Sequence, residues 1–215
     1  MKQFRKPVRH LFTFTLLLGF SFFWVGCSSS KENIYDTAIE DYTQAIALDS
    51  EDPAVYYNRA EAYIGKGEYD KAIGDCNKAI LLKPVYSEAF DRRGVARTRA
   101  GLRATNNGKF DSIGKGEYDK AIENLDKAIS LNPDSDSPYT WYFLGRTYHE
   151  KGELDKAIEN YDRAISLDPE DADFWYYRGF AYKGKSEFNK AIENYDQAIR
   201  LDPENAEYWS SRGFA

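Results

Sequence analysis

The amino-acid sequence predicts an all-α solenoid, in which pairs of antiparallel helices stack on one another. The first observation is a repeat, because one alanine recurs at Ala38, Ala72, Ala121, Ala157 and Ala191, at intervals of 34, 49, 36 and 34 residues. The second is the helical spacing of apolar residues within each unit, and the third is a glycine or proline where each apolar stripe ends. A single helix pair of this kind cannot bury both of its faces, so copies must stack.

The clearest unit, residues 138–171, shows how each helix follows from the sequence. Trp141, Leu144 and Tyr148 have i, i+3, i+7 spacing, which predicts the apolar stripe of a first helix. Gly152 stands where this helix must end, in position for a left-handed C-cap. A second helix follows and ends before a proline. Small residues stand where the two helices must cross closely: Gly145, Ala157 and Ala164.

The other units follow the same plan along the chain. The expected array is a half repeat at 33–52, full repeats at 53–86, 87–135, 138–171 and 172–205, and a half repeat at 206–215. The first half repeat supplies only a second helix, and the last supplies only a first helix.

The third unit carries fifteen extra residues and the segment IGKGEYDKAI at 113–122, an identical copy of residues 64–73. Two conformations fit this insertion: both helices lengthened, or a projecting loop over about 101–116. Gly114 and Gly116 favour the loop, because glycine is unfavourable inside a helix. The insertion is also the most basic stretch outside the N-terminus, with Arg97, Arg99, Arg103 and Lys109 in or beside it.

A helix–turn–helix period of 34 residues with these repeated positions resembles the tetratricopeptide repeat (TPR) family. The resemblance covers residues 33–215 and implies a right-handed solenoid whose first helices line a concave groove. It further implies that outward residues of those helices bind a protein or peptide. These groove residues are Tyr57, Asn58, Arg92, Tyr142, Phe143, Arg146, Tyr176, Tyr177 and Phe180.

The composition of this expected groove suits protein recognition. Aromatic and arginine side chains are the types that anchor protein interfaces, so we expect an extended or helical partner segment held by aromatic contacts. The alternative is that about half of the tyrosines and phenylalanines only pack between neighbouring helices.

The first 26 residues have the pattern of a secretory signal peptide. Lys2, Arg5, Lys6 and Arg9 precede an uncharged apolar run from Leu11 to Val25. That run is shorter than the roughly 20 residues that a membrane-spanning helix needs.

The segment Val25-Gly26-Cys27 at the end of this run resembles a bacterial lipobox. The resemblance implies cleavage before Cys27, attachment of lipid, including an acyl chain such as palmitate, to that residue, and a short tether over 27–32. An uncleaved signal anchor and ordinary cleavage without lipid remain the alternatives. Ser28 stands where an inner-membrane retention signal would have aspartate, which favours the outer membrane or cell surface.

Charge and composition bear on the partner and the chemistry. The formal net charge is −6, and without the first 26 residues it is −10, which argues against nucleic acid as the partner. No catalytic arrangement, cofactor motif or metal-ligand spacing is present in the sequence. The acidic turns at 134–136 and 168–173 lack the glycine and closing glutamate of a calcium loop and are better explained as helix caps. We interpret Cys76 as a small buried residue rather than a reactive thiol.

These observations predict a lipid-anchored, non-catalytic adaptor that mediates protein–protein interactions in the bacterial cell envelope. One alternative is a self-assembling structural protein, because an unpaired second helix at one end and an unpaired first helix at the other could join head to tail into a homo-oligomer. Another is that the chain is the N-terminal part of a longer protein with a catalytic domain.

Overall fold

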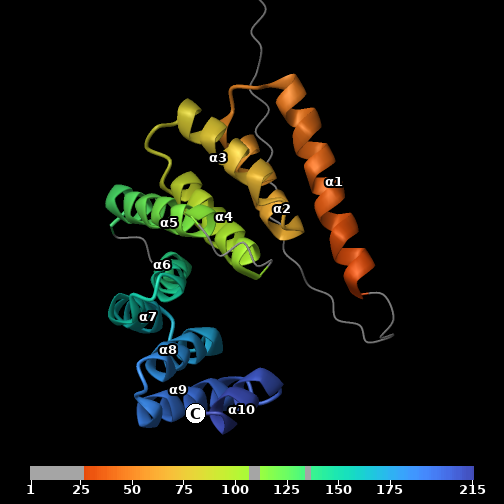
Figure 1. Ribbon diagram of the computed structural model, residues 1–215. Helices are drawn as coiled ribbons and strands as arrows, with labels where there is room; N and C mark the ends of the chain where they lie inside the picture. Colours follow the sequence, from red (N-terminus) through yellow and green to blue (C-terminus); the bar gives the residue numbers. More distant parts are fainter. Residues whose placement is uncertain (1–26, 107–111, 134–136) are drawn as a thin grey trace, which may run out of the picture.

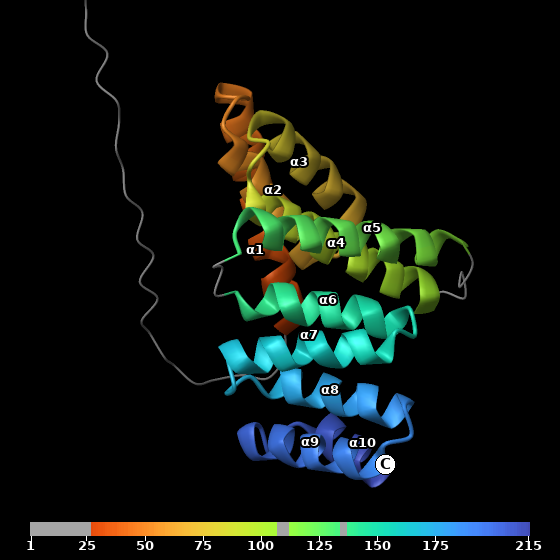
Figure 2. The ribbon, with the colours of Figure 1, turned by 90° about the vertical axis from the view of Figure 1, so that its left-hand side faces the viewer.

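The structure is a computed structural model that describes residues 27–106, 112–133 and 137–215. Over these ranges the chain forms ten α-helices and no strand: α1 Cys27–Leu48, α2 Pro53–Lys66, α3 Tyr69–Leu82, α4 Ser87–Asn106, α5 Ser112–Leu131, α6 Pro138–Glu150, α7 Leu154–Leu167, α8 Ala172–Gly184, α9 Phe188–Leu201 and α10 Ala206–Gly213. The predicted all-α solenoid of antiparallel helix pairs is confirmed (Figures 1 and 2).

The helices form two layers that follow one arc. The first helices of the pairs are α2, α4, α6, α8 and α10, and the second helices are α1, α3, α5, α7 and α9. Each second helix contacts the first helix that follows it, and α2, α4, α6 and α8 also contact one another in succession. The first helices therefore make a continuous layer on the inner side of the arc, while α3, α5, α7 and α9 lie on its outer side (Figure 1). The helix α1 lies at the N-terminal end, on the other side of α2 from α3.

Local sequence signals account for the ends of the helices. Gly152 has a left-handed φ of 79°, and its N–H donates to the carbonyl of His149 at 2.9 Å, so the predicted C-cap is confirmed. The carboxylate of Asp171 accepts a hydrogen bond from the N–H of Asp173 at 2.9 Å at the start of α8. The acidic turn at 168–173 thus caps a helix, as expected, whereas 134–136 lies outside the described residues.

The predicted close crossing at Gly145 is confirmed. A Cβ atom placed there would lie 2.8 Å from the buried ring of Tyr161 and 3.1 Å from the carbonyl oxygen of Ala157. Two other helix pairs have the same close crossing, with Leu125 over Gly94 and Tyr195 over Gly179. At the equivalent positions of the second unit stand Ala60 and Cys76, which are both fully buried.

Cys76 is fully buried and unpaired, and burial raises the pKa of its thiol to about 12. A thiol with such a raised pKa is a poor nucleophile at neutral pH. The residue therefore acts as a small core side chain, as the sequence indicated.

The first helix differs from the expectation. The predicted tether over 27–32 is helical, because α1 begins at Cys27 rather than near residue 33. A helix rises about 1.5 Å per residue, so this segment is much shorter than an extended tether would be. Within the described ranges no helix is both long and apolar enough to cross a membrane, and the apolar run at 11–25 lies outside those ranges.

The insertion in the third unit lengthens both helices, so the loop expected over 101–116 is wrong for most of that range. Residues 101–106 belong to α4 and residues 112–116 belong to α5. The extension is held by an ion pair from Arg97 to Glu117 at 2.7 Å and by a hydrogen bond from Arg103 to the carbonyl of Gly67 at 3.0 Å. These tertiary contacts outweigh the helix-breaking tendency of the glycines.

The two copies of IGKGEYDKAI adopt different conformations. In residues 64–73 the chain turns at Gly67, which has a left-handed φ of 76°, while residues 113–122 lie within the continuous helix α5. The ten-residue sequence alone therefore does not determine whether the chain turns. It turns between the short helices α2 and α3, and it is helical where α4 and α5 are longer.

Candidate functional site

One column of side chains joins each first helix to the next across the inner layer. The ring of Tyr142 on α6 lies 5.3 Å from that of Phe174 on α8, and the ring of Tyr176 lies 4.9 Å from that of Tyr208 on α10. Between α4 and α6 the two helices are joined by a hydrogen bond, which the hydroxyl of Thr140 donates to the carboxylate of Asp91 at 2.6 Å. We call this column the seam; its residues are Asp91, Thr140, Tyr142, Phe174, Tyr176 and Tyr208.

Three of the expected groove residues are buried in or beside this seam, which corrects their predicted outward placement. The side chains of Tyr142, Phe143 and Tyr176 are only 7%, 5% and 5% exposed. The reason is the close side-by-side packing of the first helices, which covers the seam positions with residues of the next helix. These three rings support the groove but do not present a free face to a partner.

The other expected groove residues remain accessible to different degrees. Phe180 on α8 is 41% exposed, and the rest of the set is half-buried: Asn58, Tyr57, Arg92, Arg146 and Tyr177. The structure thus brings residues from α4, α6 and α8 together along one surface, while Tyr57 and Asn58 lie on α2 towards the N-terminal end.

Two accessible residues are missing from the sequence-based set. The guanidinium of Arg99 lies 5.4 Å above the ring of Phe143, and the ring of His149 packs 5.2 Å from that of Phe180. The sequence indicates Arg99 only as part of a basic stretch, and its position relative to α6 depends on the lengthened α4. We define the inner strip as Arg99, Arg146, His149, Tyr177 and Phe180, which lie over the buried ring of Phe143.

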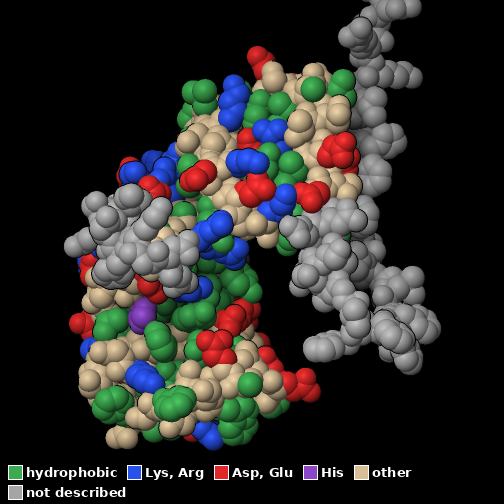
Figure 3. Space-filling model, turned by 45° about the vertical axis from the view of Figure 1, so that its right-hand side comes forward, with side chains coloured by type: hydrophobic (Ala, Val, Ile, Leu, Met, Phe, Trp, Pro, Cys, Tyr) green, Lys and Arg blue, Asp and Glu red, His purple; other side chains and the backbone are tan. Residues whose placement is uncertain are grey.

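The accessible ring of Tyr177 packs on a layer of buried rings that joins α6 to α8. Ring centroids are 5.1 Å apart for Tyr142 and Phe143, 5.5 Å for Tyr142 and Tyr177, and 5.0 Å for Tyr176 and Tyr177. Offset and edge-to-face rings at these distances are favourable and rigid. Figure 3 shows the hollow on the inner side of the arc, with hydrophobic and basic side chains in its upper part and acidic side chains along its lower part.

The two arginines of the inner strip have no carboxylate partner among the described residues, whereas five other arginines do: Arg59, Arg92, Arg97, Arg178 and Arg212. Arg146 lies 4.5 Å above the ring of Tyr177 and contacts the hydroxyl of Tyr142 at 3.5 Å, but among the described residues no carboxylate pairs with it. Arg99 likewise has only its contact with Phe143 within the described part of the chain. By contrast, Arg92 is paired with Glu61. Half-buried guanidinium groups of this kind are available for an acidic group of a partner.

A small cavity of about 100 Å³ lies beside this surface, between α2, α4, α5 and α6. Tyr57, Asp91, Arg92, Thr140 and Trp141 are among the residues that line it. Within the described ranges no group of three or more histidine, cysteine or acidic side chains is placed to hold a metal ion.

The buried carboxylate of Asp91 is expected to make the free energy of unfolding depend on pH. Burial raises its pKa more than Arg92 and the Thr140 hydroxyl lower it. A carboxyl group with a raised pKa binds its proton more tightly in the folded state, so its contribution favours folding at low pH and is lost as pH rises through that pKa. We expect Asp91→Asn to raise the free energy of unfolding by about 1 kcal/mol at neutral pH, and this gain to shrink towards zero in acid.

Urea denaturation of the wild type and Asp91→Asn across the acidic pH range measures this difference. The exposed Asp70, which has no ion pair among the described residues, supplies the control Asp70→Asn. A gain that stays constant as the pH falls would contradict the assignment to the charge on Asp91.

Comparison with known proteins connects this geometry to a family. A family model described as "TPR repeat" matches residues 31–67 and 145–186, and models described as "Tetratricopeptide repeat" match 53–86, 172–205 and 113–135. Together these matches cover more than half of the chain.

Solved structures resemble most of the chain. A crystal structure of MamA is 26% identical with a TM-score of 0.62, and the match covers 87% of this chain and 100% of that one. TTC0263, a thermophilic TPR protein of Thermus thermophilus, is 20% identical with a TM-score of 0.68, covering 87% of this chain and 93% of that one. The second likeness shows the fold alone.

Curated relatives match shorter segments. The Hsp70-Hsp90 organizing protein of Triticum aestivum is 41% identical over 76 residues, which are 35% of this chain and 13% of that protein. Serine/threonine-protein phosphatase T of Aspergillus oryzae is 44% identical over 73 residues, which are 34% of this chain and 15% of that protein. The matches therefore span less than a fifth of the length of either relative.

Proposed function

Because the chain belongs to the tetratricopeptide repeat family, we propose that it is a non-catalytic scaffold that binds a protein partner along the hollow lined by its first helices. The observation that supports this most directly is the inner strip. It combines rigid aromatic rings with two arginines that have no carboxylate partner among the described residues. Aromatic and arginine side chains of this kind are the types that anchor protein interfaces.

The chemistry of the strip suggests the kind of segment that would bind. Arg99 and Arg146 would pair with one or two acidic groups, and charge-assisted hydrogen bonds of this type are about twice as strong as neutral ones. The exposed ring of Phe180 and the ring of Tyr177 would cover apolar side chains of the same segment. We therefore propose an acidic segment with interspersed apolar residues, in an extended or helical conformation.

Two further points concern location. We propose that the scaffold is exported and held on a bacterial membrane through lipid on Cys27, so that it acts in the cell envelope. The support is the basic and apolar pattern of residues 1–26 and the lipobox-like residues before Cys27. Two or three acyl chains would anchor the protein stably.

Anchoring can be tested in cells that express the full chain. Cys27→Ser is expected to abolish incorporation of a labelled palmitate analogue and to move the protein out of the membrane fraction. Cys76→Ser is the control, since that thiol is buried in the solenoid and should have no part in labelling. Equal labelling of the Cys27→Ser variant and the wild type would contradict lipid attachment at this residue.

A photo-crosslinking residue at position 180 tests the groove. Phe180 is 41% exposed on α8, and Phe188 is 47% exposed at the start of the outer helix α9, so the two sites match in residue type and exposure. We expect irradiation of intact cells to link a partner to the Phe180 variant and not to the Phe188 variant. The same proteins captured from both positions would show that the hollow is not the binding surface.

A further inference from the structure

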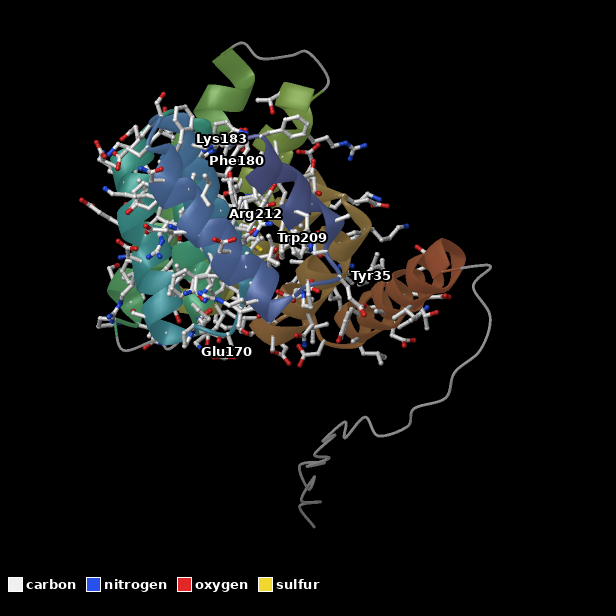
Figure 4. All side chains as sticks on the ribbon, turned by 90° about the horizontal axis from the view of Figure 1, so that it is seen from below. Tyr35, Glu170, Phe180, Lys183, Trp209 and Arg212 are labelled. Carbon is white, nitrogen blue, oxygen red and sulfur yellow. The ribbon has the colours of Figure 1, made fainter. Side chains whose placement is uncertain are left out.

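The first helices α4, α6 and α8 run in the same direction, because each is separated from the next by one antiparallel second helix (Figure 2). Their N-terminal ends therefore lie along one edge of the hollow and their C-terminal ends along the other. Figure 4 shows this for α8, with Glu170 just before its start in the lower part of the view and Lys183 near its end in the upper part. The two edges of the hollow carry charges of opposite sign.

The acidic edge consists of Glu88 at the start of α4 and of Asp171 and Asp173 at the start of α8. Glu88 and Asp173 are exposed, and Asp171 is half-buried. The hydroxyl of Tyr139 on α6 donates to Asp171 at 2.8 Å, and that of Tyr208 on α10 donates to Asp173 at 2.7 Å. These bonds join both carboxylates to neighbouring first helices. None of the three acidic groups forms an ion pair within the described ranges.

The basic edge consists of Arg99 on α4, Arg146 on α6 and Lys183 on α8, whose side chains are all half-buried. The two guanidinium groups lie over aromatic rings, and the Nζ atom of Lys183 lies 6.0 Å from the centre of the Phe214 ring. In the part of the chain that the structure describes, no carboxylate pairs with any of these three cations. Each of them is therefore available to an acidic group of a partner.

The two edges lie too far apart to neutralise each other. On α8, Lys183 follows Asp173 by ten residues, which is about 15 Å along the helix axis. Attraction between solvent-exposed charges is largely screened at such a distance. An acidic residue in the first turn and a basic one in the last turn also stabilise a helix by themselves. That effect does not require either residue to lie on the inner face of the helix, as these two do.

One stripe of α8 shows the surface that a partner would meet. Asp173, Tyr177, Phe180 and Lys183 are spaced by four, three and three residues, so they share one face of the helix. Across that face an acidic group is followed by two accessible rings and then by a basic group. A segment that complements this face must present basic, apolar and acidic side chains in three different directions. An α-helix does so, whereas the side chains of an extended segment point in only two opposite directions.

We propose that the partner segment is an α-helix that lies across the first helices, with basic residues along one flank and acidic residues along the other. This inference rests on the proposed function, in which the hollow binds a protein segment. The basic flank meets the acidic edge, the acidic flank meets the basic edge, and apolar residues between them cover Tyr177 and Phe180. A helix with its side chains is about 10 to 12 Å wide, which fits between edges about 15 Å apart.

The spacing of the first helices predicts a repeat in the partner helix. Packed helices lie about 8 to 10 Å apart, and α4, α6 and α8 contact one another in succession. A partner helix rises about 1.5 Å per residue, so it passes from one first helix to the next in about six or seven residues. We expect charged residues to recur at that interval along each of its flanks.

Isothermal titration calorimetry with the protein captured at position 180 tests the acidic edge. Asp173→Lys is expected to weaken the complex about tenfold or more, because the new cation would repel the basic flank. A wholly acidic segment would give the opposite result and bind this variant more tightly. Asp70→Lys is the matched control, since Asp70 is an exposed residue in the first turn of the outer helix α3. It should change the dissociation constant by less than about twofold.

Asp173→Asn covers the case in which Asp173→Lys does not fold, because its amide oxygen can still accept the hydrogen bond from Tyr208. It should weaken the complex in the same direction by a smaller factor, with an unchanged circular dichroism spectrum. The conformation of the partner is measured on its crosslinked segment, made as an isotope-labelled peptide. Chemical shifts of the bound peptide should be those of a helix, and extended values would overturn the proposal.

The proposed function and this inference fail in different ways. If no protein is captured at position 180, or if Arg146→Glu leaves binding unchanged, the proposed function is wrong and the inference falls with it. If capture succeeds and Arg146→Glu weakens binding, but the folded Asp173 variants bind as tightly as the wild type or more tightly, only the helix with two charged flanks is overturned.

Discussion

Replacing Tyr161 by cysteine is expected to lower the free energy of unfolding by about 3 kcal/mol or more. The ring of Tyr161 is fully buried and fills the space over Gly145, so its removal loses burial and leaves a cavity. Gly145→Ala is expected to cost about 1 to 3 kcal/mol for the opposite reason, since the new Cβ would press on the same ring and on the carbonyl of Ala157.

The double variant Gly145→Ala/Tyr161→Cys transfers the pair found naturally at Ala60 and Cys76 into the fourth unit. The added methyl group would occupy part of the vacated space. We therefore expect the double variant to be more stable than the sum of the two single effects by about 1 to 2 kcal/mol. Urea denaturation followed by circular dichroism measures all four proteins of the cycle.

Tyr161→Phe is the control for the ring itself. The hydroxyl of Tyr161 is buried with no hydrogen-bond partner among the described residues, so its removal should leave stability unchanged or raise it slightly. Strictly additive effects in the double variant would show that the two residues do not share one packing site.

The second large effect concerns binding. Arg146→Glu is expected to weaken the complex with a partner captured at Phe180 by about 10- to 100-fold. Arg146 is half-buried against Tyr177 and has no carboxylate partner among the described residues, so its charge is free to meet an acidic group of the partner. The reversed charge would repel that group. Isothermal titration calorimetry with the purified partner measures the dissociation constant.

Arg200→Glu is the matched control, because it makes the same change in net charge at an exposed position on the outer helix α9. It should change the dissociation constant by less than about twofold. Arg146→Gln separates loss of charge from reversal and should fall between the wild type and Arg146→Glu. Equal weakening by Arg146→Glu and Arg200→Glu would mean that only net charge matters, and the inner strip would then have no special role.

Some features of the structure could be predicted from repeat spacing and local chemistry. The crossing at Gly145 was predictable because a residue without a side chain, placed within an apolar stripe, indicates a close approach of two helices. The left-handed cap at Gly152 was predictable for a similar local reason. Each of these inferences uses residues that lie near one another in the sequence.

The accessible part of the candidate site could not be predicted in the same way. Tyr142 and Tyr177 are both tyrosines on first helices, yet Tyr142 is buried and Tyr177 is partly open. The difference depends on which side of each helix faces the next first helix. The rotation of each first helix about its axis depends on how it packs against the outer helices. The residue type alone does not indicate that rotation.

By itself, the sequence determined that this chain is an array of helix pairs, where most pairs begin and end, and which small residues lie at their crossings. These follow from periodicity, caps and residue volume, which act over a few helical turns. Only the tertiary structure decided that residues 113–122 are helical while their copy at 64–73 turns, and that Tyr142 and Tyr176 form a buried seam. Both outcomes depend on contacts between helices, and identical or similar residues respond to their different neighbours.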